Sequence, residues 1–114
     1  MYKMTFNADG SLASKTLFAQ LPCVDGMVID RTNDRIYACD SKTNAIRMVD
    51  PNGSVRVLAQ NGDTDGSNGL LDQPAEPLLR GPQLVLANFD VPEPTFVNTK
   101  TDAPHTISVI DLSK

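Results

Sequence analysis

The sequence predicts an all-β fold, and three observations support this prediction. The apolar segments are short and rich in β-branched residues, and turn sequences such as NADG, RTND, DPNG and RGP separate them. Short apolar runs bounded by such turns are typical of strands, and almost no segment has helical periodicity. The third observation is an internal repeat, which predicts how the strands are arranged.

Nine segments are predicted to be strands, most of them in pairs around a turn. Segments 2–7 and 16–21 flank NADG, 26–30 and 35–40 flank RTND, and 45–50 and 55–60 flank DPNG. After a polar connector, 76–80 and 83–90 flank RGP, and 106–112 follows a proline-containing segment. Several strands, such as MVI, IYAC and LVL, are apolar on both faces. Strands of this kind are expected where sheets stack face to face.

The composition fits one folded domain. The chain has 114 residues, of which 40% are hydrophobic and 21% are charged, as is ordinary for a domain with a packed core. Its formal net charge is −4, so we expect neither nucleic acid nor a membrane as a partner. No apolar run reaches the roughly 18 residues of a membrane-spanning helix. The first residues lack the pattern of a signal peptide, and we expect a cytoplasmic protein.

The two cysteines do not predict a zinc site. Cys23 and Cys39 have no CxxC spacing, and no histidine is near them in the sequence. We expect both to be buried free thiols in a reducing compartment, with a disulfide as the alternative.

The strand sequences repeat with a period of about 50 residues. YKMTFNADGS followed by LFAQ resembles IRMVDPNGS followed by VLAQ. VDGMVIDRTNDRIYACD aligns with AEPLLRGPQLVLANFD, which matches Asp25 to Glu76 and Asp40 to Asp90. Four strands in a period of this length predict the blade of a β-propeller.

The repeat predicts a single domain, a partial β-propeller of about two four-stranded antiparallel blades. Residues 1–21 are expected to form outer strands of one blade, 22–60 a full blade, and 61–114 a long connector and three strands of the next. Such an open stack exposes an apolar face and unpaired edges. We therefore expect self-association that completes the propeller, or a longer protein of which this is a piece. A small β-sandwich or barrel is the alternative fold.

The segments that carry a resemblance to a known family are PCVDGMVID, RIYACD, IRMVDPNG and LDQPAEP…LANFD…NTKTDAPHTISVIDL. They resemble the C-terminal part of the regucalcin/gluconolactonase family of six-bladed, NHL-like propellers. The resemblance implies hydrolysis of a sugar lactone by water that a calcium or zinc ion activates in the central channel. It also implies that Asp25, in the DG motif, is a metal ligand and the catalytic base.

The resemblance covers only part of the family's site. The other metal ligands of the family come from blades upstream of the VDG motif, and this chain has no residues there. A monomer is therefore expected to lack lactonase activity. The alternative function is a non-catalytic module that uses propeller blades for binding or assembly.

The strand order places more candidate ligands at the same rim as Asp25. Asp25 and Glu76 begin inner strands, whereas Asn88 and Asp90 lie together at the end of the strand that follows Glu76. In an up-and-down sheet these ends meet at one rim, next to the long connectors, where function commonly lies. Carboxylate and amide oxygens suit a hard divalent cation. Asp25 and Glu76 are the principal metal candidates, and Asn88 and Asp90 are secondary ones.

The connector NGDTDGSNGLLD, residues 61–72, resembles a calcium loop in its spacing. Asp63, Asp65 and Gly66 stand at positions 3, 5 and 6 of an EF-hand loop. However, no helices are predicted on either side, and Asp72 stands where the loop has a glutamate. Asp63 and Asp65 are therefore secondary metal candidates. The segment is interpreted mainly as the connector that leads to Glu76.

Overall fold

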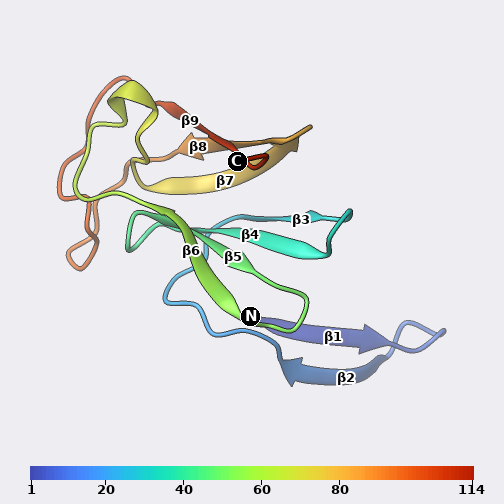
Figure 1. The fold of residues 1–114 in the computed structure, drawn as a ribbon. Coiled ribbons are helices and arrows are strands. Elements are labelled where there is room, and N and C mark those ends of the chain that lie inside the picture. Colours follow the sequence, from blue (N-terminus) through green and yellow to red (C-terminus); the bar gives the residue numbers. More distant parts are fainter.

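The computed structural model describes all 114 residues, which form nine strands in three antiparallel sheets (Figure 1). The first sheet is a hairpin of β1 (Tyr2–Phe6) and β2 (Leu12–Leu17). The second contains β3 (Met27–Asp30), β4 (Arg35–Asp40), β5 (Ala45–Val49) and β6 (Val55–Gln60). The third contains β7 (Pro74–Arg80), β8 (Gln83–Asn88) and β9 (Ile107–Asp111). One short 3-10 turn, η1 (Ser67–Gly69), lies between β6 and β7.

The all-β prediction is confirmed, and none of the sheets closes into a barrel. No helix of the structure has the length and hydrophobicity needed to cross a membrane. Eight of the predicted strands overlap the observed ones closely, but the second was wrong: it was predicted at 16–21 and lies at Leu12–Leu17. The turn after β1 is tight, because Asn7 and Ser11 are hydrogen-bonded to each other, so the polar sequence LASKT pairs with β1. The apolar residues that follow, Phe18 and Ala19, instead bond through their amides to the Met1 carbonyl.

The strands of each sheet are paired in the order of the chain. Figure 1 shows the sheets as layers, with β3–β6 between the β1–β2 hairpin and β7–β9. The two larger sheets come closest where β7 lies against β3 and β4. Stacked propeller blades and sandwich-like sheets both fit this arrangement.

The main core lies between the two larger sheets. It consists of Leu71 from the connector and of buried side chains from three strands. The strand residues are Tyr37 and Cys39 in β4, Ile46 in β5, and Leu84 and Leu86 in β8. Tyr37, Ala38 and Cys39 are consecutive and all buried. β4 is therefore covered on both faces, as its sequence predicts.

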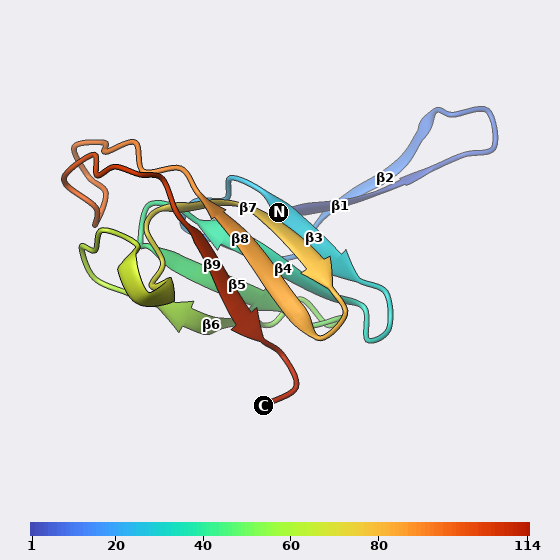
Figure 2. The same cartoon turned by 90° about the horizontal axis from the view of Figure 1, so that it is seen from above.

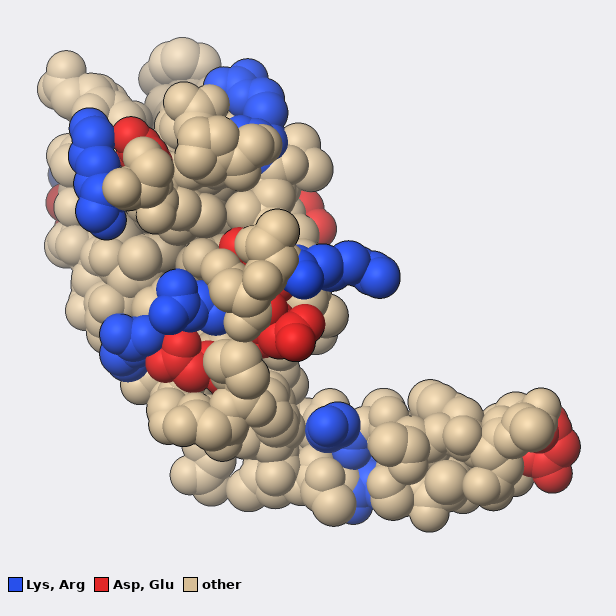
Figure 3. All heavy atoms as spheres, turned by 45° about the vertical axis from the view of Figure 1, so that its right-hand side comes forward, with Lys and Arg blue, Asp and Glu red and all other residues tan.

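The β1–β2 hairpin projects from the rest of the molecule as an arm (Figure 2). Every residue from Tyr2 to Leu17 is exposed, and Tyr2, Met4 and Phe6 are each at least half exposed. Figure 3 shows that few charged side chains cover this arm. At its base, the Met1 amino group donates a hydrogen bond to the Ala19 carbonyl at 2.8 Å.

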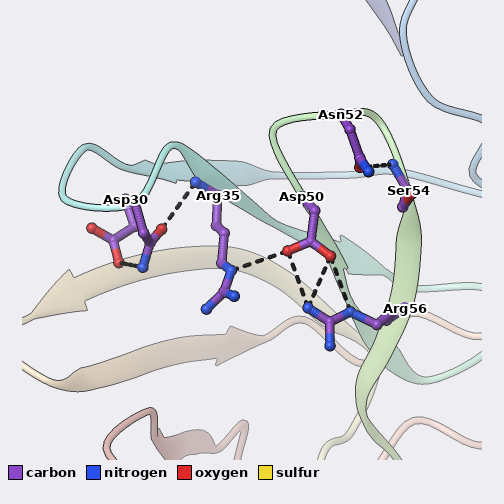
Figure 4. Close-up of polar contacts among 7 residues, drawn as sticks. Asp30, Arg35, Asp50, Asn52, Ser54 and Arg56 are labelled. Carbon is purple, nitrogen blue, oxygen red and sulfur yellow. Dashed lines mark hydrogen bonds and ion pairs between the residues drawn. The ribbon is translucent and has the colours of Figure 1, made fainter.

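One end of the second sheet is held by local polar contacts around its two tight turns (Figure 4). Asp50 accepts from Arg35 at 3.1 Å and pairs with Arg56 at 2.8 Å. Asp30 accepts hydrogen bonds from the Thr32 hydroxyl and amide, and these lower the pKa of its carboxyl. Because both arginines are well exposed, each ion pair contributes little to stability. We interpret this end of the sheet as structural, and the long connectors lie at the other end.

Candidate functional site

The candidate site lies at the end of the two larger sheets where the long connectors run. Segments 61–73 and 89–106 cross here. We call this end of the molecule the connector rim. It also includes the neighbouring residues 25–26, 40–44, 74–76 and 88. The connectors are tied to the turn after β4, since the Val97 amide donates to the Lys42 carbonyl at 2.9 Å. They are also tied to each other, since the Thr99 hydroxyl donates to Asp63 at 2.5 Å.

Asp25 and Glu76, the principal candidates, lie at the junction between the two larger sheets. The Gly26 amide donates a hydrogen bond to the Ala75 carbonyl at 2.7 Å, and the Asp25 amide donates to the Cys39 carbonyl at 3.0 Å. A Cβ atom on Gly26 would lie only 2.3 Å from Oε2 of Glu76. The Glu76 carboxylate therefore rests directly against the residue that follows Asp25. Both acidic residues are exposed.

The thiol of Cys39 is buried close to this pair of carboxylates. Burial, followed by the negative charges of Glu76 and Asp25, raises the pKa of Cys39 to about 12. The thiol is therefore protonated at neutral pH and is not an activated nucleophile there. Cys23 is only half-buried, with its sulfur 3.8 Å from the Ser41 hydroxyl, and the two cysteines form no disulfide. The expectation that both are buried is wrong for Cys23, because the chain before β3 runs along the surface.

Two exposed carboxylates can provide part of the coordination shell of a hard divalent cation. They can also accept a proton from water. Calcium takes six to eight oxygen ligands, and no three His, Cys, Asp or Glu side chains of the chain are grouped to hold a metal ion. The Asp25–Glu76 pair therefore supplies only part of such a coordination shell.

A second group of oxygen atoms is buried deeper in the connector rim, around Asp72 and Asp90. These residues are 1% and 0% exposed. An amide N–H of Asn98 donates to Asp72, and the backbone N–H of Asp102 donates to Asp90. Burial, reinforced by the negative charges of Asp90 and Asp102, raises the pKa of Asp72 to about 6. The structure thus places Asp90 in a buried cluster with Asp72, whereas the Asp25–Glu76 pair is exposed.

Asn88, a secondary candidate, is buried at the end of β8 and holds β9 in place. Its amide group donates to the Thr106 hydroxyl at 2.9 Å and to the Ser108 hydroxyl at 2.8 Å. Its carbonyl oxygen has no hydrogen-bond partner. The donor half of this side chain is therefore structural, and only its oxygen remains available to a ligand.

Asp63 and Asp65, the other secondary candidates, are exposed on the first connector. Asp63 accepts from Thr99, as described above, and Asp65 accepts from the Ser67 amide at 2.9 Å. Hydrogen bonds from Ser67 lower the pKa of the Asp65 carboxyl. The segment contains only the short η1 turn and no flanking helices, so it does not have the architecture of an EF-hand.

Sequence reasoning did not identify Asp72, Gln73 and Asn98 as site residues. All three are buried although they lie on connectors, where polar side chains are usually exposed. The signals in the sequence are the polar character of both connectors and the EF-hand-like spacing that ends at Asp72. Neither signal shows that the connectors cover each other, because their contacts join residues far apart in the chain, such as Asp72 and Asn98, which are 26 positions apart.

Comparisons with known proteins do not assign the chain to a family. No protein-family model matches it, and no curated protein matches it significantly.

Proposed function

We propose that this chain is a partial β-propeller that contributes the Asp25–Glu76 edge of a metal-dependent sugar-lactone hydrolase. The observation that carries the proposal is the hydrogen bond from Gly26 to Ala75, which keeps Asp25 and Glu76 at one edge of two neighbouring sheets. In a propeller the inner strands of adjacent blades border a central channel. Two carboxylates at the starts of such strands would face that channel together.

The way the sheets approach each other is compatible with the proposed propeller, as it is with a sandwich. The close approach involves β7 with β3 and β4, the strands that a propeller would place innermost, and not the outer strands β6 and β9. Sheets that are closest on one side and diverge on the other resemble blades arranged around an axis.

A divalent ion, calcium or zinc, would supply Lewis-acid chemistry at this edge by polarising a lactone carbonyl and lowering the pKa of bound water. Asp25 and Glu76 would hold the ion, because carboxylates are hard oxygen ligands. Asp25 is exposed and can accept the proton of the water that attacks the lactone carbonyl. The remaining ligands would come from residues outside this chain.

We further propose that copies of the chain associate to complete the channel. The β1–β2 arm exposes Tyr2, Met4 and Phe6, and β9 exposes Ile107 and Val109. β9 is also an edge strand without a partner on one side. Exposed apolar strands with an open edge favour association with another chain.

A second candidate function is a non-catalytic assembly module built from propeller blades. The observation that favours it is that no three metal-ligating acidic, histidine or cysteine side chains are grouped within the chain. If copies associate without bringing further ligands to Asp25, the assembly would bind partners but would not hydrolyse lactones.

The test combines the mass in solution with an activity assay. Light scattering measures the oligomeric state, and hydrolysis of gluconolactone is followed with calcium, zinc or a chelator. We expect an oligomer with metal-dependent hydrolysis that is lost in Asp25→Asn and Glu76→Gln and retained in Asp34→Asn, which changes an exposed turn at the other end of the sheet. An inactive oligomer favours the assembly module, and a strict monomer without activity excludes the self-completed enzyme.

A further inference from the structure

We propose that the buried part of the connector rim is a calcium-binding site formed by Asp72, Asp90 and the side-chain oxygens of Gln73 and Asn98. This site is separate from the Asp25–Glu76 pair and does not depend on lactone hydrolysis. It would join the two long connectors to each other.

The first observation is a set of buried oxygen atoms without partners. Four buried side-chain atoms of the chain have no hydrogen-bond partner, and all are acceptor oxygens at this end of the third sheet: Gln73 Oε1, Asn88 Oδ1, Asp90 Oδ1 and Asn98 Oδ1. Each of these residues is at most 4% exposed. Buried polar atoms are nearly always paired, so a group of unpaired acceptors indicates a missing donor or cation.

The hydrogen bonds around these atoms place the residues that carry them in one neighbourhood. Asn98 donates its amide N–H to Asp72, so its side chain lies against this carboxylate. Gln73 donates to the carbonyl of Val91, the neighbour of Asp90, at 2.6 Å. Asp90 uses one oxygen to accept from the Asp102 amide and leaves the other free. Donors thus position each side chain while one oxygen remains unused.

The charge balance favours a cation over a neutral water molecule. None of the ion pairs of the chain involves Asp72 or Asp90. Lys100 lines the outer depression with Asp63, Asp65 and Asp102, but it is exposed and forms no ion pair. Burial and the neighbouring carboxylates raise the pKa of Asp72 to about 6. A water molecule would satisfy hydrogen bonds only, whereas a cation would also offset the negative charge.

The types of ligand select calcium among the common metal ions. Carboxylate and amide oxygens are hard donors, and calcium accepts six to eight of them in flexible geometry. Magnesium demands a nearly ideal octahedron, which irregular connectors do not readily supply. Zinc prefers histidine and cysteine, and neither residue belongs to this group. Two carboxylates together with two amide oxygens therefore suit calcium.

The test is a calorimetric titration of the chelator-treated chain with calcium chloride, together with thermal unfolding. We expect saturable binding with a dissociation constant of about 1 mM or lower. We also expect the melting temperature to rise by about 10–15 °C when calcium exceeds this constant about a hundredfold. Absence of binding by the unaltered chain at about 10 mM calcium would overturn the proposal.

Variants then locate the site. Asp90→Asn should weaken calcium binding at least about tenfold, because a charged ligand is lost. Asp111→Asn, at the exposed end of β9, should bind calcium as the unaltered chain does, and Asp25→Asn should lose only the ion proposed for the Asp25–Glu76 pair. Calcium binding that persists in Asp90→Asn and disappears in Asp25→Asn would contradict this site. Loss of hydrolysis in Asp25→Asn with calcium binding retained would separate this site from the proposed enzyme.

A second variant keeps the proposal testable if Asp90→Asn does not fold. Asn98→Asp retains the free oxygen and adds a negative charge beside Asp72. Without calcium its melting temperature should fall, because the donor to Asp72 is replaced by a like charge. With calcium the temperature rise should exceed that of the unaltered chain. A rise that is equal or smaller would show that calcium does not bind between these side chains.

Discussion

Gly26→Ala tests how the two larger sheets meet. Gly26 does not have a positive φ angle, so alanine brings no backbone strain and its effect is steric. The added Cβ would lie 2.3 Å from Oε2 of Glu76 and 2.4 Å from the carbonyl oxygen of Ala75. The exposed Glu76 side chain can move away. The Ala75 carbonyl belongs to β7, and it can move only if the hydrogen bond from Gly26 is lengthened or lost.

The expected loss of stability follows from these two effects. Forcing an extra carbon into a filled position costs about 1–3 kcal/mol, and losing one backbone hydrogen bond costs about 0.5–1.5 kcal/mol. We therefore expect the free energy of unfolding to fall by about 2–4 kcal/mol. Urea unfolding measures this change, with the fluorescence of Tyr37 as a core probe, because the chain has no tryptophan.

Gly62→Ala is the matched control. Gly62 also lacks a positive φ angle, and a Cβ added there has no atom within 4 Å. Its free energy of unfolding should change by less than about 0.5 kcal/mol. If Gly26→Ala is no less stable than Gly62→Ala, the two sheets do not meet at Gly26 and Ala75 as described, and the Asp25–Glu76 pair loses its structural basis.

Three further predictions concern other polar groups. Arg47→Met should lower the free energy of unfolding by about 3 kcal/mol in urea titrations, because it leaves the fully buried Asp40 without its ion-pair partner. The pKa of Asp30, measured by carboxyl NMR, should lie below its ordinary value of 3.8. Asp30 then stabilises the fold above pH 3.8, and this contribution is lost as the pH falls through the folded pKa. At about pH 8 a thiol reagent should modify Cys23 in the native chain and leave Cys39 unmodified until the protein unfolds.

Each of these predictions has its own control. Arg56→Met removes an exposed ion pair with Asp50 and should lower the free energy of unfolding by less than about 1 kcal/mol. An equal loss of stability in Arg47→Met and Arg56→Met would contradict the prediction for Arg47. A carboxyl pKa of Asp30 at or above 3.8 would mean that its turn hydrogen bonds do not persist in solution. Native Cys23→Ser should show no reactive thiol, and a reactive one would place Cys39 at the surface.

Much of the fold was predictable because most strands are bounded by strong turn sequences. RTND, DPNG and RGP separate apolar runs, and the strands on either side of them were found with small boundary errors. The second strand was missed for a physical reason. LASKT is a strand without a buried face, so its pairing with β1 depends on the turn and not on hydrophobic burial.

The candidate site was less predictable, and its two parts differ. Asp25 and Glu76 were identified because both occupy equivalent places in a repeat that is visible in the sequence. Asp72 and Asn98 were not identified, since their contact depends on how two irregular connectors cross. Such a crossing is decided by tertiary packing, which leaves no periodic pattern in the chain.

The chain-order pairing of the strands has a consequence for how the molecule folds. Each pairing within a sheet joins strands that are consecutive in the chain. Every pairing except that of β8 with β9, which a long connector separates, can therefore form from short-range contacts that close quickly. The contact between Gly26 and Ala75 and the crossing of the connectors join distant parts of the sequence. These long-range contacts carry the larger loop-closure entropy, so we expect the residues of the connector rim to come together after the sheets that support them.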